Sequence, residues 1–334
     1  MKFLHITDIH LDHLQEQTRP VYIAETGKTK RVTGLKEFVD YYQHRIVADG
    51  LDGIFLTGDI TTCQHLPDHL KFLAEMIKCP IYFILGNHDY YGGDKIMGGL
   101  SQKFATTCDR DLGPATTGVQ HSTNLHYMTA RKESIIQTTE EGKKIAIVGS
   151  DGWYDGEYAY FSRSELFMTD FVTIKEFKTL FKETIKEKTR SGQFYPMTPG
   201  DSFFSYHREH GLPYPLQKKF KDVAMEFTKI LDEQIVHALA NDVNEIVVLT
   251  HVPPYENNSQ YRGKVSDEDW MPYFSSKFCG DAVRIAALNN PKVKFTVLCG
   301  HSHADVTNQV RENLVCYTTA AEYRQIYAGR VLEF

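Results

Sequence analysis

The chain has 334 residues, of which 42% are hydrophobic and 24% are charged, a composition typical of a globular protein with a sizeable core. No apolar run approaches the roughly 20 residues that a membrane-spanning helix needs, so a membrane is not an expected partner. The formal net charge of −6 gives no electrostatic basis for following a nucleic-acid backbone, which disfavours duplex nucleic acid as a partner.

The first part of the chain repeats one unit, in which a helix leads into an apolar strand that ends in a polar loop. Strands are predicted at residues 3–6, 54–56 and 81–85, because each is a short apolar run closed by polar residues or glycine. Between them, apolar side chains recur at helical spacing in residues 35–47 and 70–77. Strands that are apolar throughout indicate a sheet covered on both faces.

Three further apolar runs predict strands at residues 145–149, 246–249 and 293–298. The stretch from residue 15 to 33 is polar and contains glycine, which predicts a long connection without regular structure. Helices alternating with apolar strands indicate an α/β fold.

The middle of the chain is expected to be an α-helical insert at about residues 150–240 within a single domain of residues 1–334. Apolar side chains at helical spacing predict two helices there, at 164–190 and 216–240. The stretch between these helices, from residue 191 to 215, is rich in Gly, Pro and aromatic residues and is predicted to be a loop.

The cysteines and the N-terminus predict a cytoplasmic protein. The apolar stretch at residues 3–6 is too short for a signal peptide. No Cys-x-x-Cys pair is present, so buried free thiols are expected, and these suit a reducing compartment. The six cysteines are Cys63, Cys79, Cys108, Cys279, Cys299 and Cys316.

Several predicted strand ends carry side chains that can bind metal ions. They are Asp8 with His10, Asp59, Asn87, His251, and His301 with His303. Each alone is more typical of a turn or a satisfied polar residue. Together they favour a joint metal site, because ligands in open α/β sheets collect beyond the carboxyl ends of the strands. Imidazole combined with carboxylate suits Zn, Fe, Mn or a similar first-row ion.

Two of these motifs carry ligands two residues apart, Asp8 with His10 and His301 with His303. We expect an extended backbone in both, because alternation along an extended chain sends both side chains to the same side.

The complete set of motifs resembles that of the calcineurin-like metallophosphoesterase superfamily. In this sequence it reads Asp8-Ile9-His10, Gly58-Asp59, Gly86-Asn87-His88-Asp89, His251 and Gly300-His301-Ser302-His303. The motifs follow the order of the family from residue 8 to 303, so the resemblance covers nearly the whole chain except the insert. It implies an α/β sandwich of mixed β-sheets flanked by helices.

The resemblance also implies two metal ions and assigns the ligands to them. One ion would be held by Asp8, His10 and His303, the other by Asn87, His251 and His301, with Asp59 as the bridge. Ions about 3.5–4 Å apart need a shared carboxylate that relieves their mutual repulsion, which agrees with this assignment.

The expected reaction is an in-line attack of metal-bound hydroxide on phosphorus, with both ions stabilising the growing charge. His88 is the candidate for protonating the leaving-group oxygen, because it adjoins the ligand Asn87 without being assigned as a ligand. Asp89 is expected to orient His88 or to stabilise its charge. The alternative for Asp89 is a turn or helix-cap residue.

The substrate is expected to be a small phosphoester, nucleotides included. Ser/Thr protein phosphatases of the superfamily continue the Gly-Asp motif with Asp-Arg-Gly and have Glu after Gly-Asn-His. Here Ile60 follows Asp59 and Asp89 follows His88, which disfavours that branch. The pattern is closer to bacterial-type phosphodiesterases, so we predict a phosphodiesterase. A phosphomonoesterase acting on nucleotides or other small phosphates is the alternative.

Two further alternatives concern the insert and the activity itself. The aromatic residues of the insert either form a wall that stacks a nucleobase or pack as the core under a helical cap. Some superfamily members keep the fold but act as scaffold or binding modules. These are expected to lose metal ligands, whereas here the whole set is present.

Overall fold

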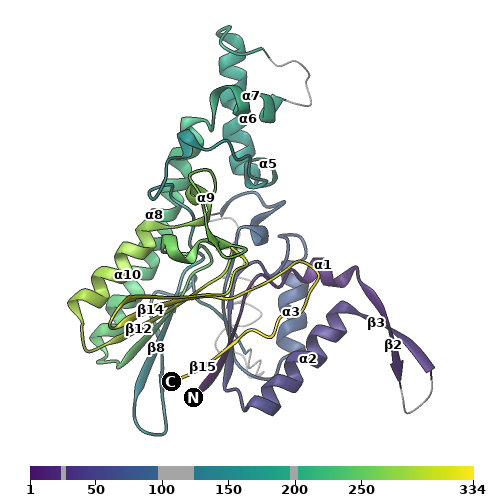
Figure 1. Cartoon of the computed structure of the whole chain (residues 1–334), viewed down its shortest axis with the longest axis vertical. Helices are drawn as coiled ribbons and strands as arrows, with labels where there is room; N and C mark the ends of the chain where they lie inside the picture. The colour runs from purple at the N-terminus through teal and green to yellow at the C-terminus, as the bar shows by residue number, and fades with distance from the viewer. Residues whose placement is uncertain (24–27, 97–123, 196–201) are drawn as a thin grey trace, which may run out of the picture.

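The computed structural model describes residues 1–23, 28–96, 124–195 and 202–334. In this part of the chain two β-sheets stack face to face, with helices on both outer sides (Figure 1). The first sheet has the order β15-β1-β4-β5-β6, in which only β15 is antiparallel to its neighbour. Its strands are β1 (Lys2–Ile6), β4 (Gly53–Thr57), β5 (Ile81–Ile84), β6 (Leu125–Tyr127) and β15 (Arg330–Glu333).

The second sheet has the order β13-β14-β12-β9-β8-β7, with antiparallel edge strands β13 and β7 and parallel strands between them. The parallel strands of both sheets end at one end of the sandwich, where their following loops meet. The strands are β7 (Ile135–Thr138), β8 (Lys144–Gly149), β9 (Glu245–Leu249), β12 (Lys294–Cys299), β13 (Val306–Arg311) and β14 (Leu314–Thr318).

Side chains of the central strands alternate between the space between the sheets and the helical layers. In β4, Phe55 packs between the sheets, whereas Ile54 and Leu56 pack beneath α2 and α3. In β8, Ile147 packs between the sheets and Val148 packs against α8 and α10. Both faces of each sheet are therefore buried, which confirms the predicted α/β sandwich. The covering helices are α2 (Gly34–Asp49), α3 (Leu66–Met76), α8 (Tyr214–Ala240) and α10 (Lys277–Asn289).

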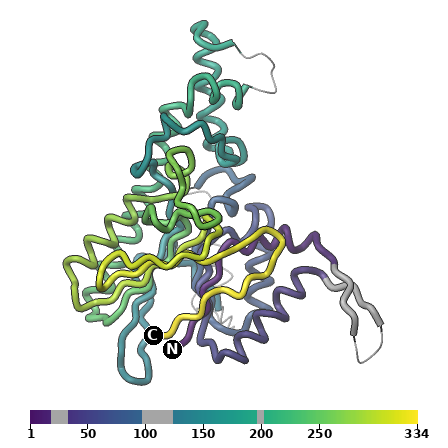
Figure 2. The backbone as a smooth tube through the Cα atoms, in the orientation of Figure 1, coloured from purple at the N-terminus to yellow at the C-terminus, as the bar shows by residue number. Residues whose placement is uncertain are grey.

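A helical arm extends from the sandwich between β8 and β9 (Figures 1 and 2). It contains α5 (Asp170–Thr173), α6 (Lys175–Arg190), α7 (Ser202–His210) and the start of α8. Phe177 of α6 and Phe220 of α8 pack with ring centroids 4.8 Å apart. Most aromatic residues of the insert belong to this core, whereas Tyr160, Tyr195, Phe204 and Tyr214 are exposed. The packing favours a core beneath the arm over an aromatic wall for substrate.

Three predicted segments differ from the structure. Residues 15–33 contain a two-stranded sheet of β2 (Thr18–Ile23) and β3 (Lys28–Thr33) rather than a plain connection. The first strand of this ribbon contains a short apolar run, Val21-Tyr22-Ile23, but the second is mostly polar and charged. The predicted helix 164–190 begins only at Asp170 and is interrupted at Ile174, which has an extended backbone. The predicted loop 191–215 contains α7.

The remaining elements are short and lie mostly in the loops around the carboxyl ends of the strands. No helix among the described residues is long and apolar enough to cross a membrane. Of the cysteines in this part of the chain, four are buried and Cys63 is half-buried, all as free thiols, and Cys108 lies outside it. The short elements are α1 (Leu11–Gln15), η1 (His88–Tyr90), η3 (Phe161–Arg163), η4 (Glu256–Asn258), β10 (Gln260–Tyr261), β11 (Lys264–Val265) and α9 (Met271–Phe274).

Candidate metal centre

The side chains singled out as metal ligands converge at one end of the sandwich. They lie in the loops that follow β1, β4, β5, β9 and β12. Among the described residues, three overlapping groups bring possible ligand atoms within 4.8 Å of one another. The groups are Asp8 with His10 and His303, His10 with Asp59 and His88, and Asp59 with His251 and His301.

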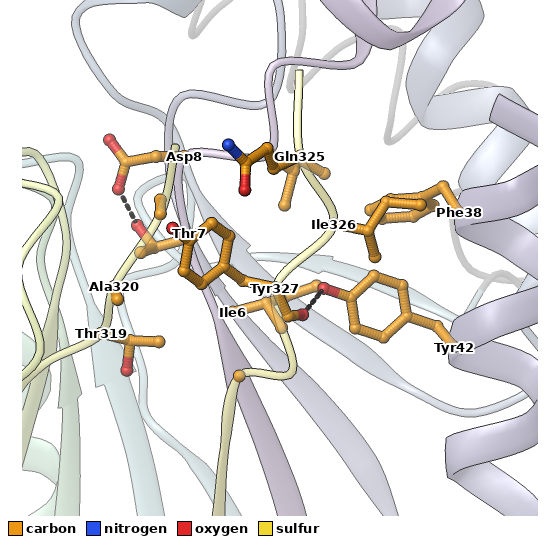
Figure 3. A pocket seen from close by; sticks show the side chains of 13 residues that line it. Ile6, Thr7, Asp8, Phe38, Tyr42, Thr319, Ala320, Gln325, Ile326 and Tyr327 are labelled. Atoms are coloured by element: carbon orange, nitrogen blue, oxygen red, sulfur yellow. Dashed lines mark hydrogen bonds between the residues drawn. The ribbon is translucent and has the colours of Figure 1, made fainter. Parts of the chain in front are cut away.

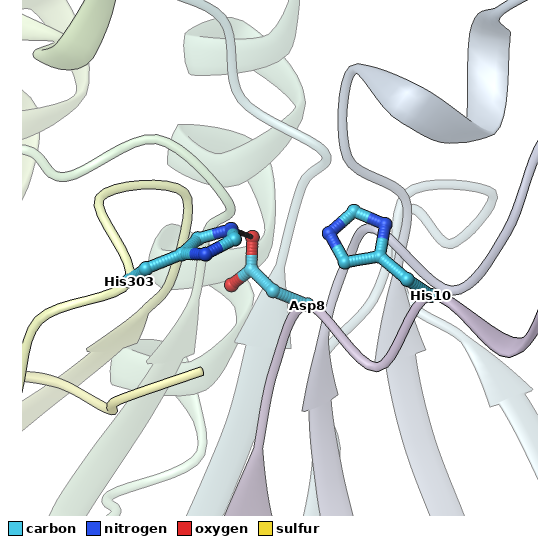
Figure 4. A group of neighbouring side chains, drawn as sticks. All are labelled: Asp8, His10 and His303. Carbon is cyan, nitrogen blue, oxygen red and sulfur yellow. Dashed lines mark ion pairs between the residues drawn. The ribbon is translucent and has the colours of Figure 1, made fainter. Parts of the chain in front are cut away.

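Asp8 lies between the two histidines of the first group (Figure 4). Its Oδ1 is 3.3 Å from Nε2 of His303. Its Oδ2 accepts hydrogen bonds from the Thr7 hydroxyl at 2.6 Å and from the backbone N–H of His301 at 3.0 Å. Burial alone would raise the pKa of Asp8, but His303 lowers it below its usual range. The carboxylate is therefore kept ionised and fixed in orientation.

Asn87 joins the group formed by Asp59, His251 and His301. Its Oδ1 lies 3.1 Å from Nε2 of His251, which in turn is 3.3 Å from Oδ1 of Asp59. The rings of His251 and His301 have centroids 5.0 Å apart. The structure thus gathers the four residues expected around the second ion and its bridge.

Hydrogen bonds to backbone carbonyls fix which nitrogen of two histidines faces the centre. Nδ1 of His251 is 2.8 Å from the carbonyl oxygen of Thr57, and Nε2 of His301 is 3.0 Å from that of Tyr273. A carbonyl only accepts, so these nitrogens carry protons, and Nε2 of His251 and Nδ1 of His301 are the nitrogens to which a metal ion could bind in place of a proton.

Asp59 occupies the middle of the constellation. Its Oδ2 is 3.9 Å from Nε2 of both His10 and His88, while its Oδ1 faces His251. Burial alone would raise the pKa of Asp59, but the surrounding histidines, led by His251, hold it well below its usual range. In return, although burial lowers the pKa of His251, the carboxylate of Asp59 raises it to about 10. Asp59 therefore lies where a ligand shared by two cations belongs.

The backbone at the ligands is left-handed rather than extended. Asp8 and His10 have φ of 50° and 40°, and His301 and His303 have φ of 65° and 57°. The prediction of an extended backbone at these ligands is therefore wrong, and alternation along a strand is not why their side chains converge. Of the eight described non-glycine residues with left-handed φ, five are predicted ligands, Asp59 included. Such a concentration of strained backbone is typical of a functional site.

The donor set fits metal ions. His10 is 1% exposed, yet neither of its ring nitrogens has a hydrogen-bond partner among the described residues. Burial lowers the pKa of His10 to about 3, so the ring is neutral and offers a lone pair. Buried polar groups normally have partners, and a cation beside Asp8 and Asp59 would supply one for this nitrogen. Imidazole, carboxylate and carboxamide ligands together suit first-row ions.

His88 and Asp89 lie in η1, immediately after Asn87. The His88 backbone N–H donates to Oδ1 of Asp59 at 2.9 Å, and its side chain is 21% exposed, more than those of its ligand neighbours. Asp89 makes no hydrogen bond to His88 among the described residues. Its carboxylate accepts from the backbone N–H groups of Ile60, Thr61 and Gly86. This geometry agrees with the turn or cap alternative for Asp89, which ties the loop after β4 to the loop after β5.

The C-terminal loop adds a residue that the sequence did not indicate. The ring of Tyr323 lies 4.4 Å from that of His10, and its hydroxyl is 3.4 Å from Nε2 of His88. The loop is anchored where the Tyr42 hydroxyl donates to the carbonyl of Tyr327, beside a cavity of about 10 Å³ (Figure 3). That volume holds about one water molecule, so this cavity is too small for a substrate.

Solved structures with similar folds share little sequence with this chain. The phosphopantetheinyl hydrolase of Mycobacterium tuberculosis is 14% identical, with a TM-score of 0.48 over 97% of this chain and 90% of that one. A dimetal phosphatase from Danio rerio is 10% identical, with a TM-score of 0.45 over 96% of this chain and 87% of that one. No curated protein matches the chain.

A family model assigns the chain more directly. The model of the calcineurin-like phosphoesterases matches residues 1–305, which include every predicted ligand. Only the strands β13, β14 and β15 of the two sheets lie beyond the match. The candidate ligand groups lie within this match. The chain therefore belongs to the calcineurin-like phosphoesterase family and is a metal-dependent phosphoester hydrolase.

Proposed function

We propose that this chain hydrolyses a small phosphodiester at a centre of two metal ions. The observation that carries the proposal is the position of Asp59, which belongs to the ligand group with His251 and His301 and lies 3.9 Å from His10 of the group with Asp8 and His303. When bound, the ions supply an activated water and positive charge against the phosphoryl oxygens. We assign one ion to Asp8, His10 and His303 and the other to Asn87, His251 and His301, with Asp59 bridging them.

The remaining polar residues of the centre act on the substrate or hold the ligands. His88 is exposed enough to reach the substrate and gives a proton from Nε2 to the leaving-group oxygen. Tyr323 lines the same side and is placed to contact the leaving group. Asp89 acts through the backbone, since it fixes the loops that carry Asp59 and Asn87.

A diester is favoured over a monoester by the charges around the centre. The ion pairs that the ligands make among the described residues connect only histidines with aspartates, and none involves Lys or Arg. A monoester carries one more negative charge than a diester near neutral pH. A centre whose ligands pair with no Lys or Arg in the described part of the chain is expected to prefer the singly charged substrate.

The first experiment compares two chromogenic substrates with chelator-treated protein reloaded with Mn²⁺. We expect faster hydrolysis of bis(p-nitrophenyl) phosphate than of p-nitrophenyl phosphate, and no turnover before reloading. Preference for the monoester would replace the proposal with a phosphomonoesterase acting on nucleotides or sugar phosphates. Metal binding without turnover of either substrate would favour a scaffold.

The substitution His88→Gln is expected to lower kcat by about 10²–10³-fold, within the range for loss of a general acid. Gln cannot donate a proton in the transition state, so the defect should grow as the leaving group becomes more basic, from p-nitrophenyl to phenyl esters. Steady-state kinetics with both esters tests this. His44→Gln, at an exposed position on α2, is the control and should behave like the wild type.

Metal content separates this role from ligation. His88 also lies within one of the three possible ligand groups, with His10 and Asp59. A proton donor can be lost without loss of metal, so His88→Gln should keep two ions per chain by elemental analysis. Loss of an ion, with the same rate defect for both esters, would make His88 a ligand instead.

A further inference from the structure

A buried carboxylate of the helical arm reaches the metal centre. Asp170, the first residue of α5, is fully buried. Its Oδ2 accepts a hydrogen bond from the Tyr91 hydroxyl at 2.9 Å and lies 3.5 Å from Nδ2 of Asn87. Its Oδ1 accepts from the Tyr154 hydroxyl at 3.3 Å. The arm thus contacts a residue that we assign as a metal ligand.

This network decides which end of the Asn87 carboxamide faces the histidines. Nδ2 of Asn87 donates to the hydroxyl oxygen of Tyr91 at 3.0 Å, and that hydroxyl donates onward to Asp170. A carboxylate only accepts hydrogen bonds, so it selects the NH₂ end of the carboxamide. The oxygen end is left to point toward Nε2 of His251, where the second ion is assigned.

Backbone contacts keep α5 in register with the loop that carries Asn87. The N–H of Gly92 donates to the carbonyl of Thr173, and the N–H of Lys175 donates to that of Gly93, both at 3.1 Å. These bonds join the end of α5 and the start of α6 to the chain a few residues beyond Asn87. The position of Asp170 relative to Asn87 is therefore fixed by main chain as well as side chains.

We infer that Asp170, through Tyr91, is a positioning residue that holds the Asn87 carboxamide oxygen toward the second metal ion. The inference rests on the proposed assignment of Asn87 as a ligand. It gives the arm a role in the metal centre, because the arm supplies a carboxylate that orients a ligand. Partners that orient ligands typically change metal affinity by about 10–100-fold when they are lost.

The test is a calorimetric titration of chelator-treated protein with Mn²⁺. We expect Asp170→Asn and Tyr91→Phe to weaken one of the two sites by about 10–100-fold and to leave the other near the wild-type value. Combining Asp170→Asn with Asn87→Ala should give no further loss beyond Asn87→Ala alone. A residue that acts only on overall stability would weaken both sites or add to the loss.

Tyr154→Phe is the matched control. It removes a hydroxyl that donates to the same carboxylate, but on the side away from Asn87. Its Mn²⁺ affinities should stay within about twofold of the wild type, because the link to the ligand remains. The inference is overturned if Tyr154→Phe weakens binding as much as Tyr91→Phe, or if Asp170→Asn binds both ions like the wild type.

Binding and turnover separate this inference from the proposed function. If the wild type binds two Mn²⁺ ions but hydrolyses neither chromogenic ester, the proposed function fails and the titration still decides the role of Asp170. If the diester is hydrolysed and the variants bind Mn²⁺ normally, only the positioning role of Asp170 fails. Absence of Mn²⁺ binding by the wild type would overturn both.

Discussion

Replacing Asp59 by Asn is expected to remove at least one metal ion per chain and to lower kcat/KM on the order of 10³-fold, as for loss of a principal electrostatic group. The carboxamide keeps the size of the side chain and can still accept the backbone hydrogen bond from His88. It loses the negative charge and the second ligand oxygen. Two cations close together can then no longer share a carboxylate, so their repulsion is unrelieved.

Elemental analysis and diester hydrolysis, measured on the same preparation, test this expectation. Asp232→Asn, on the exposed face of α8, is the control for loss of one carboxylate and should keep metal and activity. An enzyme should lose both together in Asp59→Asn, whereas a scaffold would keep its partner binding. If Asp59→Asn binds two ions tightly and turns over the diester like the wild type, Asp59 is not the bridging ligand.

The parts of the fold that sequence patterns predicted are those with strong local signals. β4 and β5 are buried throughout because both faces of their sheet are covered, and each is followed by the polar motif of its loop. The candidate ligands follow such strands directly, so the predicted end of a strand also locates the ligand residue in the loop after it. Asp59 and His251 are far apart in the chain but were both predictable from their own surroundings.

The missed features depend on contacts between distant segments. Asp170 is 83 residues from Asn87, and nothing near it in the sequence differs from the ordinary helix predicted over residues 164–190. Tyr323 lies beyond the last motif, on a loop whose position is set by packing against α2. Left-handed φ at Asp8 and His10 is likewise imposed by tertiary contacts, including the bond from the His10 N–H to the carbonyl of Asp59.

The substitution Gly86→Ala is expected to lower kcat/KM by about 10²–10³-fold, an effect similar to loss of one electrostatic group from an active site. A Cβ at residue 86 would lie 2.2 Å from Oδ1 of Asp59, 2.5 Å from its backbone nitrogen and 2.7 Å from Cε1 of His251. These distances are too short for non-bonded contacts of a carbon atom. The carboxylate and the imidazole must move apart, and with them the ligands of both ions.

The effect of Gly86→Ala on the metal centre should exceed its effect on stability. Overpacking of this kind typically costs about 1–3 kcal/mol, so the metal-free variant should still fold and unfold cooperatively at a lower temperature. Gly142→Ala is the control, because its Cβ would meet open space while its φ of +81° penalises alanine. That variant should lose a little stability and keep two ions and full turnover. If Gly86→Ala also keeps both, the packing of Gly86 against Asp59 and His251 does not determine the geometry of the metal centre.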